Sequence, residues 1–404
     1  MREFIENTKT NGLASLIVYL IVFTTILSIL ALYSPFSFLI PGKRLPINLT
    51  DHDISRCDLF DGQWVQDPKG PLYKNTSCST IPSSKNCFLH GRNDTEFLYW
   101  RWKPYGCELT RFEPTTFLDI VRDKRLAFIG DSVARNQMES LLCLLSQEET
   151  PIDVFKDAKD RSRTWFFPRS NFTLMVLWTR FLIKGVEREG GVFDLHLDQV
   201  DENWAQNVSH GVVDFAIVSD SQWFFKKNYL YENGKLIGSL DCNETDVNEF
   251  DVGFTIGKAF QTTLRYINDC ENCKDMVTIV RTISPSHFEN GTWKTGGNCE
   301  RTKLYNTKDV GDLLTEGKNK VEWEVRNVQL EEVERVRKDA ATSRDNFRVM
   351  DITKVMVTRP DGHPGSHWRD KKKKGFNDCV HWCMPGPIDV WNDLMLALLS
   401  RITL

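Results

Sequence analysis

Residues 125–145 read RLAFIGDSVARNQMESLLCLL, and this one stretch combines a strand, a tight turn and a helix. The apolar run Arg125–Gly130 is typical of a buried strand, and it ends in glycine. Apolar residues then recur at helical spacing over 136–145. A strand that leads directly into a helix is the building unit of α/β sheets, whose active sites lie where the strand ends. Ser132 occupies this point.

The same alternation continues along the chain. Buried strands are predicted at 214–219, 275–281 and 347–351, and helices at 253–268, 317–337 and 387–399. Strands that alternate with helices indicate a mostly parallel sheet between two helical layers. We therefore expect an α/β fold with three layers.

A second motif, Asp378-Cys-Val-His381, lies near the C-terminus. A serine, a histidine and an aspartate together convert a weak hydroxyl nucleophile into a strong one. The Asp-x-x-His spacing lets one turn present both the base and the carboxylate that orients it. If the fold brings the two motifs together, Ser132 is the nucleophile, His381 the base and Asp378 the orienting acid of an acyl-transfer or ester-hydrolysis site.

Both motifs also have a purely structural interpretation. A serine that follows a strand commonly caps the next helix. His381 beside Asp378 is equally typical of a buried, hydrogen-bonded histidine next to a capping carboxylate. Three further histidines are rival bases, although each is more simply explained as a loop residue: His287, His363 and His367.

The turn around Ser132 also predicts which groups stabilise an oxyanion. Amides at a helix N-terminus point toward bound negative charge, so the backbone N–H of Ser132 is the first donor. Gly130 and Asp131 in the turn are further candidates for this part of the site, as are Arg135 and Asn136 one helical turn on.

The chain contains 12 tryptophans. Sugar rings stack their C–H faces on aromatic side chains, so this abundance is typical of a carbohydrate site. Trp223 and Trp382 are expected to line the substrate site. For each tryptophan taken singly, packing in the core is the alternative.

The N-terminal region has the properties of a membrane anchor. Residues 13–33 carry no charged side chain, and a single crossing takes about 20 residues. A cleaved signal peptide is the alternative, but the run lacks a clear small-x-small cleavage site. We expect a cytosolic tail at 1–12, an anchor at 13–33, a stem at 34–55 and a lumenal domain at 56–404.

The chain after the anchor carries two marks of the secretory pathway. Seven Asn-x-Ser/Thr sequons follow the anchor and none precedes it: Asn48, Asn75, Asn93, Asn171, Asn207, Asn243 and Asn290. All 11 cysteines also follow it, as in domains that fold in an oxidising compartment. These features predict a glycosylated, disulfide-bonded type II protein.

Four of the cysteines lie within 57–107, in a segment rich in Pro, Gly and Asn. We expect residues 56–115 to form a disulfide-stapled cap on a catalytic core at 116–404. Structural zinc is the alternative use of cysteine, but only Cys270 and Cys273 have the Cys-x-x-Cys spacing. No metal is therefore predicted. Because the count is odd, at least one thiol lies outside intramolecular pairs.

The net charge of −4 over 404 residues excludes a strongly basic protein, and no basic stripe of the nucleic-acid-binding kind is present. We expect no nucleic-acid partner. The one charged run, four lysines at 371–374, is typical of a solvated loop. Alternatively, it attracts an anionic donor or polymer toward the second motif.

Together these motifs resemble the trichome-birefringence-like family of plant polysaccharide O-acetyltransferases. The resemblance extends from about Cys57 to the C-terminus. It rests on CDLFDGQWV at 57–65, FLYWRWKPYGCELTRF ending at Phe112, FIGDSVARNQMESLLCLL at 128–145, RTISPSHFENGTW at 281–293, GGNC at 296–299, RPDGHPG at 359–365 and DCVHWCMPGPIDVWN at 378–392. The order and the spacing of these motifs match those of the family.

The resemblance implies an SGNH/GDSL-like α/β/α fold with a mostly parallel central sheet, in a single-pass type II protein of the Golgi membrane. It implies the roles given above for Ser132, His381 and Asp378. It also implies four disulfides, Cys57–Cys107, Cys78–Cys143, Cys87–Cys383 and Cys299–Cys379, and leaves Cys242, Cys270 and Cys273 without an assigned pairing.

The chain departs from the family pattern at one turn. Many members have Gly-His-Trp after the second strand, where this chain has Ser221-Gln222-Trp223. A role for a histidine in that turn is therefore in doubt.

The activity that the resemblance implies is transfer of acetyl groups to backbone hydroxyls of a plant cell-wall hemicellulose, of the xyloglucan or mannan type. No cofactor is expected to be bound, but an acetyl donor is required. Acetyl-CoA, an acetylated carrier and an acetyl-relay protein would each fit. The alternatives are an acetyl esterase of the same fold and a noncatalytic wall-polysaccharide-binding protein. A glycosyltransferase is disfavoured because no suitable loop carries an Asp-x-Asp motif.

Overall fold

The computed structural model describes residues 57–242, 245–306, 310–315, 317, 319–339, 346–369 and 376–403. The expected tail, anchor and stem at 1–55, the sequons at Asn48 and Asn243 and the lysine run at 371–374 lie outside these residues. No helix within the described ranges is both long and apolar enough to cross a membrane.

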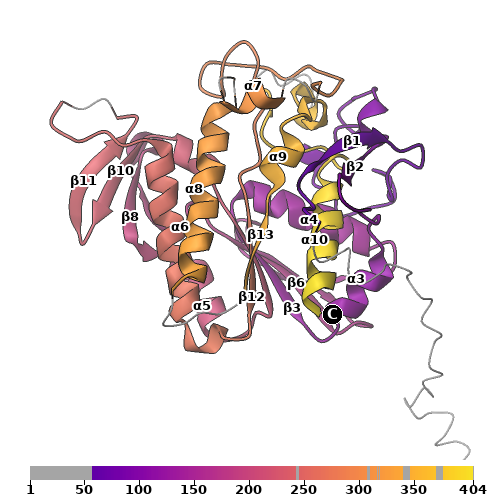
Figure 1. Ribbon diagram of the computed structural model, residues 1–404, viewed down its shortest axis with the longest axis horizontal. Coiled ribbons are helices and arrows are strands. Elements are labelled where there is room, and N and C mark those ends of the chain that lie inside the picture. Colours follow the sequence, from indigo (N-terminus) through magenta and orange to yellow (C-terminus); the bar gives the residue numbers. More distant parts are fainter. Residues whose placement is uncertain are drawn as a thin grey trace, which may run out of the picture. The chain divides into compact units, whose positions relative to one another are not determined.

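A mostly parallel sheet forms the centre of the described chain (Figure 1). Its strands are β3 (Arg125–Gly130), β4 (Ile152–Lys156), β5 (Arg163–Phe167), β6 (Phe172–Trp178), β9 (Phe215–Ser219), β12 (Val277–Arg281) and β13 (Phe347–Met350). They are arranged in the order β13-β12-β9-β3-β6-β5-β4. The first five run parallel, whereas β5 and β4 are antiparallel to their neighbours. The predicted mostly parallel sheet is confirmed, with β3 near its middle.

Helices cover both faces of this sheet (Figure 1). On one side lie α3 (Pro114–Ile120), α4 (Ser132–Leu145) and α10 (Asp389–Thr403), and on the other α5 (Glu202–Ser209), α6 (Val252–Asp269) and α8 (Lys320–Arg337). Alternate side chains of β3 pack against the two helical layers, because successive side chains of a strand point to opposite faces. Leu126 and Phe128 pack with α4 and α10, and Ala127 and Ile129 with α6 and α8. The three-layer prediction is therefore confirmed.

The sequence did not predict a second sheet, which packs against helix α6 (Figure 1). Its strands are β7 (Ile183–Glu187), β8 (Phe193–Val200), β10 (Asn228–Glu232) and β11 (Lys235–Leu240), in the order β11-β10-β8-β7. The helix predicted at 317–337 begins at Lys320, and a separate short helix, α7 (Val310–Thr315), precedes it.

The N-terminal part of the described chain packs onto the core instead of forming its own. Its two strands, β1 (Gly62–Gln66) and β2 (Trp100–Pro104), pair in antiparallel fashion. The rings of Trp64 and Trp102 pack edge to face, with their centroids 5.8 Å apart. The Trp64 indole N–H donates to the backbone O of Val355, just inside the short helix α9 (Ile352–Met356). The cap and the catalytic core therefore share one hydrophobic cluster.

Five disulfides are formed among the described cysteines. Four are the pairs that the resemblance implies: Cys57–Cys107, Cys78–Cys143, Cys87–Cys383 and Cys299–Cys379. The fifth joins Cys270 to Cys273, so their Cys-x-x-Cys spacing serves a disulfide. Cys242 lies outside these five pairs.

The described sequons differ in accessibility. Asn93, Asn171 and Asn290 are exposed, whereas Asn75 and Asn207 are half-buried. Asn207 lies within α5, where its amide donates to the backbone O of Asn203 at 3.0 Å. We therefore rank the three exposed sequons first as glycosylation candidates.

Removing the Cys87–Cys383 disulfide should destabilise the protein strongly. This bond joins residues 296 apart in sequence, so it removes much conformational freedom from the unfolded chain. We expect Cys87→Ser with Cys383→Ser to lower the free energy of unfolding by about 2–5 kcal/mol. The matched control is Cys270→Ser with Cys273→Ser, whose bond closes a separation of 3 and should cost clearly less. Equal losses in denaturant unfolding would contradict this account.

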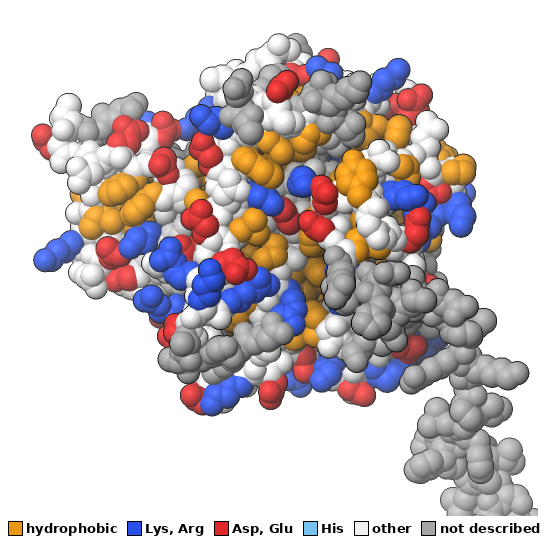
Figure 2. All heavy atoms as spheres, viewed as in Figure 1, with side chains coloured by type: hydrophobic (Ala, Val, Ile, Leu, Met, Phe, Trp, Pro, Cys, Tyr) orange, Lys and Arg blue, Asp and Glu red, His pale blue; other side chains and the backbone are white. Residues whose placement is uncertain are grey.

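The surface in view mixes charges of both signs (Figure 2). On α8, for example, Arg337 pairs with Glu334 at short helical spacing, and both side chains are partly or fully exposed. Exposed pairs of this kind contribute little to stability. We therefore attribute the stability mainly to the two hydrophobic clusters and the disulfides.

Candidate active site

The turn after β3 determines the position of Ser132, the predicted nucleophile. Gly130 has φ +154°, and a Cβ there would lie 1.7 Å from the backbone O of Ser219 in β9, so only glycine fits. Asp131 caps α4, because its Oδ1 accepts from the amides of Val133 (2.8 Å) and Ala134 (3.4 Å). The capping role considered for Ser132 thus belongs to Asp131, and the Ser132 hydroxyl is left for other partners.

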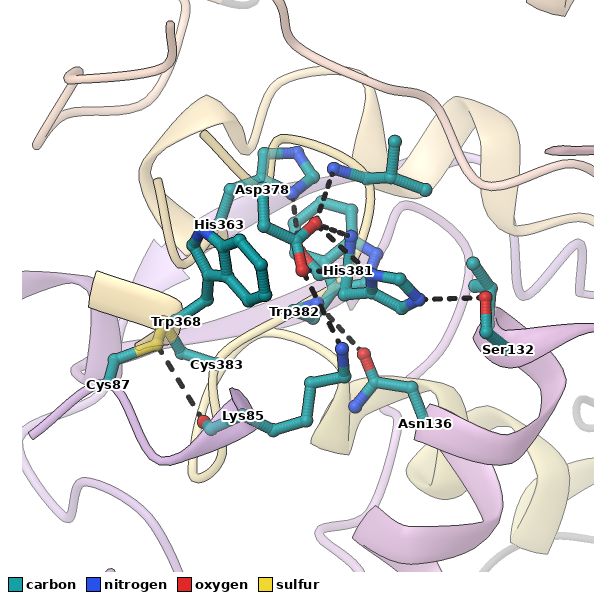
Figure 3. A network of polar contacts seen from close by, with 12 residues as sticks. Lys85, Cys87, Ser132, Asn136, His363, Trp368, Asp378, His381, Trp382 and Cys383 are labelled. Carbon is teal, nitrogen blue, oxygen red and sulfur yellow. Dashed lines mark hydrogen bonds and ion pairs between the residues drawn. A yellow bond between two sulfur atoms is a disulfide. The ribbon is translucent and has the colours of Figure 1, made fainter. Parts of the chain in front are cut away.

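Ser132, His381 and Asp378 form one hydrogen-bonded chain (Figure 3). The Ser132 Oγ lies 2.8 Å from His381 Nε2, and His381 Nδ1 lies 2.9 Å from Asp378 Oδ2. The fold therefore brings together the two motifs that are far apart in sequence. Nucleophile, base and orienting carboxylate stand in the order that a serine triad requires.

Asp378 is held in its charged form. Its Oδ1 accepts from the amides of Val380 (3.2 Å) and His381 (3.0 Å), so the carboxylate is fixed by its own turn. Burial acts to raise its pKa, but His381, the Lys85 ammonium and these hydrogen bonds together hold the pKa well below its ordinary value. A carboxylate in this state can set the His381 tautomer with the proton on Nδ1 and the lone pair on Nε2, facing Ser132.

The three rival histidines do not contact Ser132. His363 and His287 are buried behind the triad, and His363 Nε2 lies 2.7 Å from His287 Nδ1. Burial lowers the pKa of His287 to about 4 and that of His363 well below its ordinary value. His363 Nδ1 lies 2.7 Å from the backbone O of His381 and supports this loop. His367 contacts the backbone O of His90.

The side chain of Asn136 holds the second motif against α4. Its Oδ1 accepts from the backbone N–H of Trp382 at 2.8 Å, which ties α4 to the residue after His381 (Figure 3). The side chain is fully buried. The structure thus gives Asn136 Oδ1 a positioning role, and the contribution of Asn136 to an oxyanion site stays a prediction.

The expectation that Trp382 lines the substrate site is wrong. This side chain is fully buried, lies 4.1 Å from the His363 ring and donates its indole N–H to Ser284 Oγ at 2.8 Å. Adjacent residues of the loop point in opposite directions, so His381 faces the groove while Trp382 enters the core. Both neighbouring cysteines, Cys379 and Cys383, are held in disulfides that fix this arrangement.

Arg135 is also not available to an oxyanion. Its Nε donates to Glu139 Oε1 at 2.7 Å, and its Nη1 donates to the backbone O of Asp160. Asp131 is buried, and besides capping α4 it accepts from the amide of Gln222 at 3.2 Å. The Ser132 amide stays the predicted oxyanion donor at the helix start, since Asp131 engages the next two amides.

A groove of about 780 Å³ opens at Ser132 and His381. Its walls carry Trp223, as predicted, together with Trp293, Trp368 and Phe376. Trp293 is 41 % exposed and Phe376 67 % exposed, which is unusual for side chains of this size. A larger cavity of about 950 Å³ between β8 and α6 contains no part of the triad. The groove is therefore the substrate site that the geometry supports.

Two comparisons place this geometry among known proteins. Residues 109–398 match the PC-Esterase family model, described as a GDSL/SGNH-like acyl-esterase family found in Pmr5 and Cas1p. The chain belongs to the PC-esterase family. The preceding residues, 55–108, match the PMR5 N-terminal domain. The triad thus lies in the family domain, and Lys85 and Cys87 lie in the N-terminal one.

Curated relatives of this PC-esterase cover nearly the same length. It is 54 % identical to xyloglucan O-acetyltransferase 3 of Populus trichocarpa, over 89 % of either chain. It is 50 % identical to xyloglucan O-acetyltransferase 4 of the same species, over 95 % of this chain and 91 % of the relative. It is 40 % identical to protein trichome birefringence-like 19 of Arabidopsis thaliana, over 89 % of this chain and 85 % of the relative. The resemblance to the trichome-birefringence-like family is confirmed.

Proposed function

We propose that this PC-esterase transfers acetyl groups to hydroxyls of a hemicellulose backbone, with xyloglucan as the first acceptor to test and mannan as the second. The observation that carries the proposal is the hydrogen-bonded Ser132–His381–Asp378 chain at the floor of an aromatic groove. Similarity to the xyloglucan O-acetyltransferases of poplar supports the choice of acceptor.

The proposed reaction has two displacement steps. In the first, His381 Nε2 takes the proton of Ser132, and the Oγ attacks the carbonyl carbon of the acetyl donor. The resulting oxyanion is stabilised by the Ser132 amide, and the donor's leaving group departs with the proton from His381. This leaves an acetyl ester on Ser132.

In the second step, an acceptor hydroxyl takes the place of the leaving group. His381 removes its proton, the oxygen attacks the acetyl-serine carbonyl, and the bond to Ser132 Oγ breaks. The proton returns from His381 to Ser132, which restores the free enzyme. Hydrolysis follows the same course with water, so transfer requires that a sugar hydroxyl fill the site better than water does.

The groove supports a sugar acceptor. Trp293 and Trp223 lie on its walls, and the Lys226 ammonium lies 4.1 Å from the Trp223 ring and 5.7 Å from the Trp293 ring. Exposed aromatic faces beside polar donors are suited to a sugar ring, which has C–H faces and a rim of hydroxyls. We propose that these residues hold the backbone of the polymer while one hydroxyl reaches Ser132.

The acetyl donor and the compartment are also proposed. Acetyl-CoA, an acetylated carrier or an acetyl-relay protein would serve as donor, and no bound cofactor is needed. We place the protein in the Golgi membrane as a single-pass type II protein, anchored by residues 13–33. The sequons and the disulfides support a lumenal catalytic domain. Glycosidase sensitivity of the full chain, with the N-terminus accessible to protease in sealed vesicles, tests this topology.

The decisive assay uses the full chain, purified in detergent from a glycosylating host. It is incubated with acetyl-CoA or an aryl acetate and with unacetylated xyloglucan, mannan, xylan and pectin oligosaccharides. Acetyl gain on xyloglucan or mannan, read by mass spectrometry, supports the proposal. Acetyl loss from pre-acetylated oligomers without any gain would instead identify an esterase, the activity that the family description names. Binding without chemistry would identify a noncatalytic wall protein.

Trp293→Ala tests the acceptor groove. Because Trp293 is 41 % exposed, its removal should leave the fold intact. We expect KM for the oligosaccharide acceptor to rise about tenfold, as for loss of a stacking contact of about 1 kcal/mol or slightly more. Hydrolysis of a small aryl acetate should stay unchanged. The control is Tyr105→Ala, an aromatic residue that is 63 % exposed and outside the groove. An unchanged acceptor KM in Trp293→Ala would exclude stacking there.

A further inference from the structure

One lysine of the N-terminal domain reaches the triad. Lys85 closes the short 3-10 helix at Ser83–Lys85, in the segment that matches the PMR5 N-terminal domain. Its side chain is only 9 % exposed, and its Nζ lies 3.6 Å from Asp378 Oδ2. The same oxygen lies 2.9 Å from His381 Nδ1. Asp378 therefore stands between the base on one side and a buried cation on the other (Figure 3).

Several bonds fix this lysine at the second motif. The backbone N–H of Met384 donates to the backbone O of Lys85 at 2.9 Å. Two residues after Lys85, Cys87 forms its disulfide with Cys383, which itself lies two residues after His381. From the same domain, the buried Arg92 donates to the backbone O of His363 at 3.0 Å. These contacts of the N-terminal cap therefore fix the position of Lys85 beside Asp378.

We propose that Lys85 is a positioning residue of the active site, which acts through Asp378 and makes the N-terminal domain part of the catalytic apparatus. The inference rests on the proposed Ser132 mechanism but on neither the acceptor nor the donor. Lys85 does not line the groove, so its effect falls on the chemical step and not on substrate binding.

The charges around the site determine what Lys85 does. It faces Asp378 and, from α4, the carboxylate of Glu139 and the guanidinium of Arg135. Glu139 is already paired with Arg135 at 2.7 Å, so the charge of Lys85 is directed mainly at Asp378. A positive charge there favours the Asp378 carboxylate. Without Lys85, the Asp378 carboxylate would act on His381 alone, so the pH dependence of the reaction should respond to this lysine.

Burial and charge act in opposite directions on Lys85 itself. Burial lowers its pKa, and the carboxylates of Asp378 and Glu139 counteract that effect. An apolar cap residue at this position would avoid the desolvation penalty of a buried ammonium. The presence of a lysine at this position is explained if its positive charge acts on Asp378 and so contributes to the triad.

The test measures how fast the Ser132 hydroxyl reacts, without any acceptor. The probe is a fluorophosphonate: Ser132 Oγ forms the bond to phosphorus, fluoride leaves, and His381 takes the serine proton. The rate of labelling of the detergent-purified full chain is followed against pH for the native chain, Lys85→Met and Lys85→Arg. The control is Lys74→Met, which removes an exposed lysine of the same domain.

In Lys85→Met we expect the acid limb of the labelling rate to move upward by about one pH unit and the plateau to fall about tenfold. Lys85→Arg, which keeps the charge, should keep the position of the limb, and Lys74→Met should match the native chain. A double variant, Lys85→Met with Asp378→Asn, distinguishes an effect that acts through Asp378 from a general loss of folded protein. If Lys85 acts through Asp378, Lys85→Met causes no further loss in that background.

Each outcome separates this inference from the proposed function. Native rates and an unshifted limb in folded Lys85→Met would overturn it, as would losses that multiply in the double variant. Labelling that persists in Ser132→Ala would instead overturn the proposed nucleophile. If Ser132→Ala is inert and Lys85→Met behaves as the native chain, only the role of Lys85 fails.

Discussion

Replacing Ser132 by alanine is expected to abolish acetyl transfer and to leave the fold intact. In the proposed mechanism the Ser132 Oγ attacks the donor, and its partner in the structure is His381 Nε2 at 2.8 Å. Loss of a triad nucleophile lowers kcat by about 10⁴-fold or more. The helix should not suffer, because Asp131 and not Ser132 provides the cap of α4.

Two measurements check this result. Acetyl gain on oligosaccharides is compared between the native chain and Ser132→Ala, and thermal unfolding should show a change in stability below about 0.5 kcal/mol. Ser79→Ala, an exposed serine of the N-terminal domain, is the matched control and should retain full activity. Acetyl transfer at the native rate by Ser132→Ala would contradict the proposal that Ser132 is the nucleophile.

The central sheet could be predicted because its strands carry a strong local signal. In β3 and β9 nearly every residue is buried, so each gives a continuous apolar run followed by a turn. The strand β4 gives no such signal, since all five of its residues are exposed. In β8, buried Phe193, Leu195 and Leu197 alternate with polar residues, so the sequence does contain the period-2 pattern of a half-buried strand.

The site shows the same division between local and long-range information. Ser132, Asp378 and His381 lie in motifs whose residue types alone indicate their chemistry. Lys85 was missed because nothing near it in sequence connects it with Asp378, 293 positions away (378 − 85). The direction of Trp382 depends on how two disulfides fix its loop, and periodicity does not determine that direction in an irregular segment.

Changing Asp378 to asparagine should cost nearly as much as removing the nucleophile, although only one atom differs. The Oδ1 of Asp378 accepts from the amides of Val380 and His381. An amide NH₂ at that position would face two N–H donors. The asparagine oxygen is therefore expected to stay there, and its NH₂ takes the place of Oδ2, beside His381 Nδ1 and the Lys85 ammonium.

This exchange reverses the tautomer of the base. The NH₂ donates to His381 Nδ1, so the ring proton moves to Nε2, and Nε2 can no longer accept the proton of Ser132. We expect kcat to fall about 10⁴-fold at neutral pH, as for the same change in other serine triads, with little change in KM. The matched control is Asp275→Asn, an exposed carboxylate outside the groove, which should behave as the native chain.

The pH dependence distinguishes this tautomer effect from a simple loss of charge. Because the pKa of Asp378 is held well below its ordinary value, the carboxylate stays ionised throughout the working range, and its stabilising contribution is lost only as pH falls through that depressed pKa. The native acid limb therefore does not report Asp378. A reversed tautomer also predicts that raising the pH restores part of the activity of Asp378→Asn, because hydroxide can then remove the serine proton without His381. Native activity of Asp378→Asn near neutral pH would show that the reaction does not require Asp378 to orient His381.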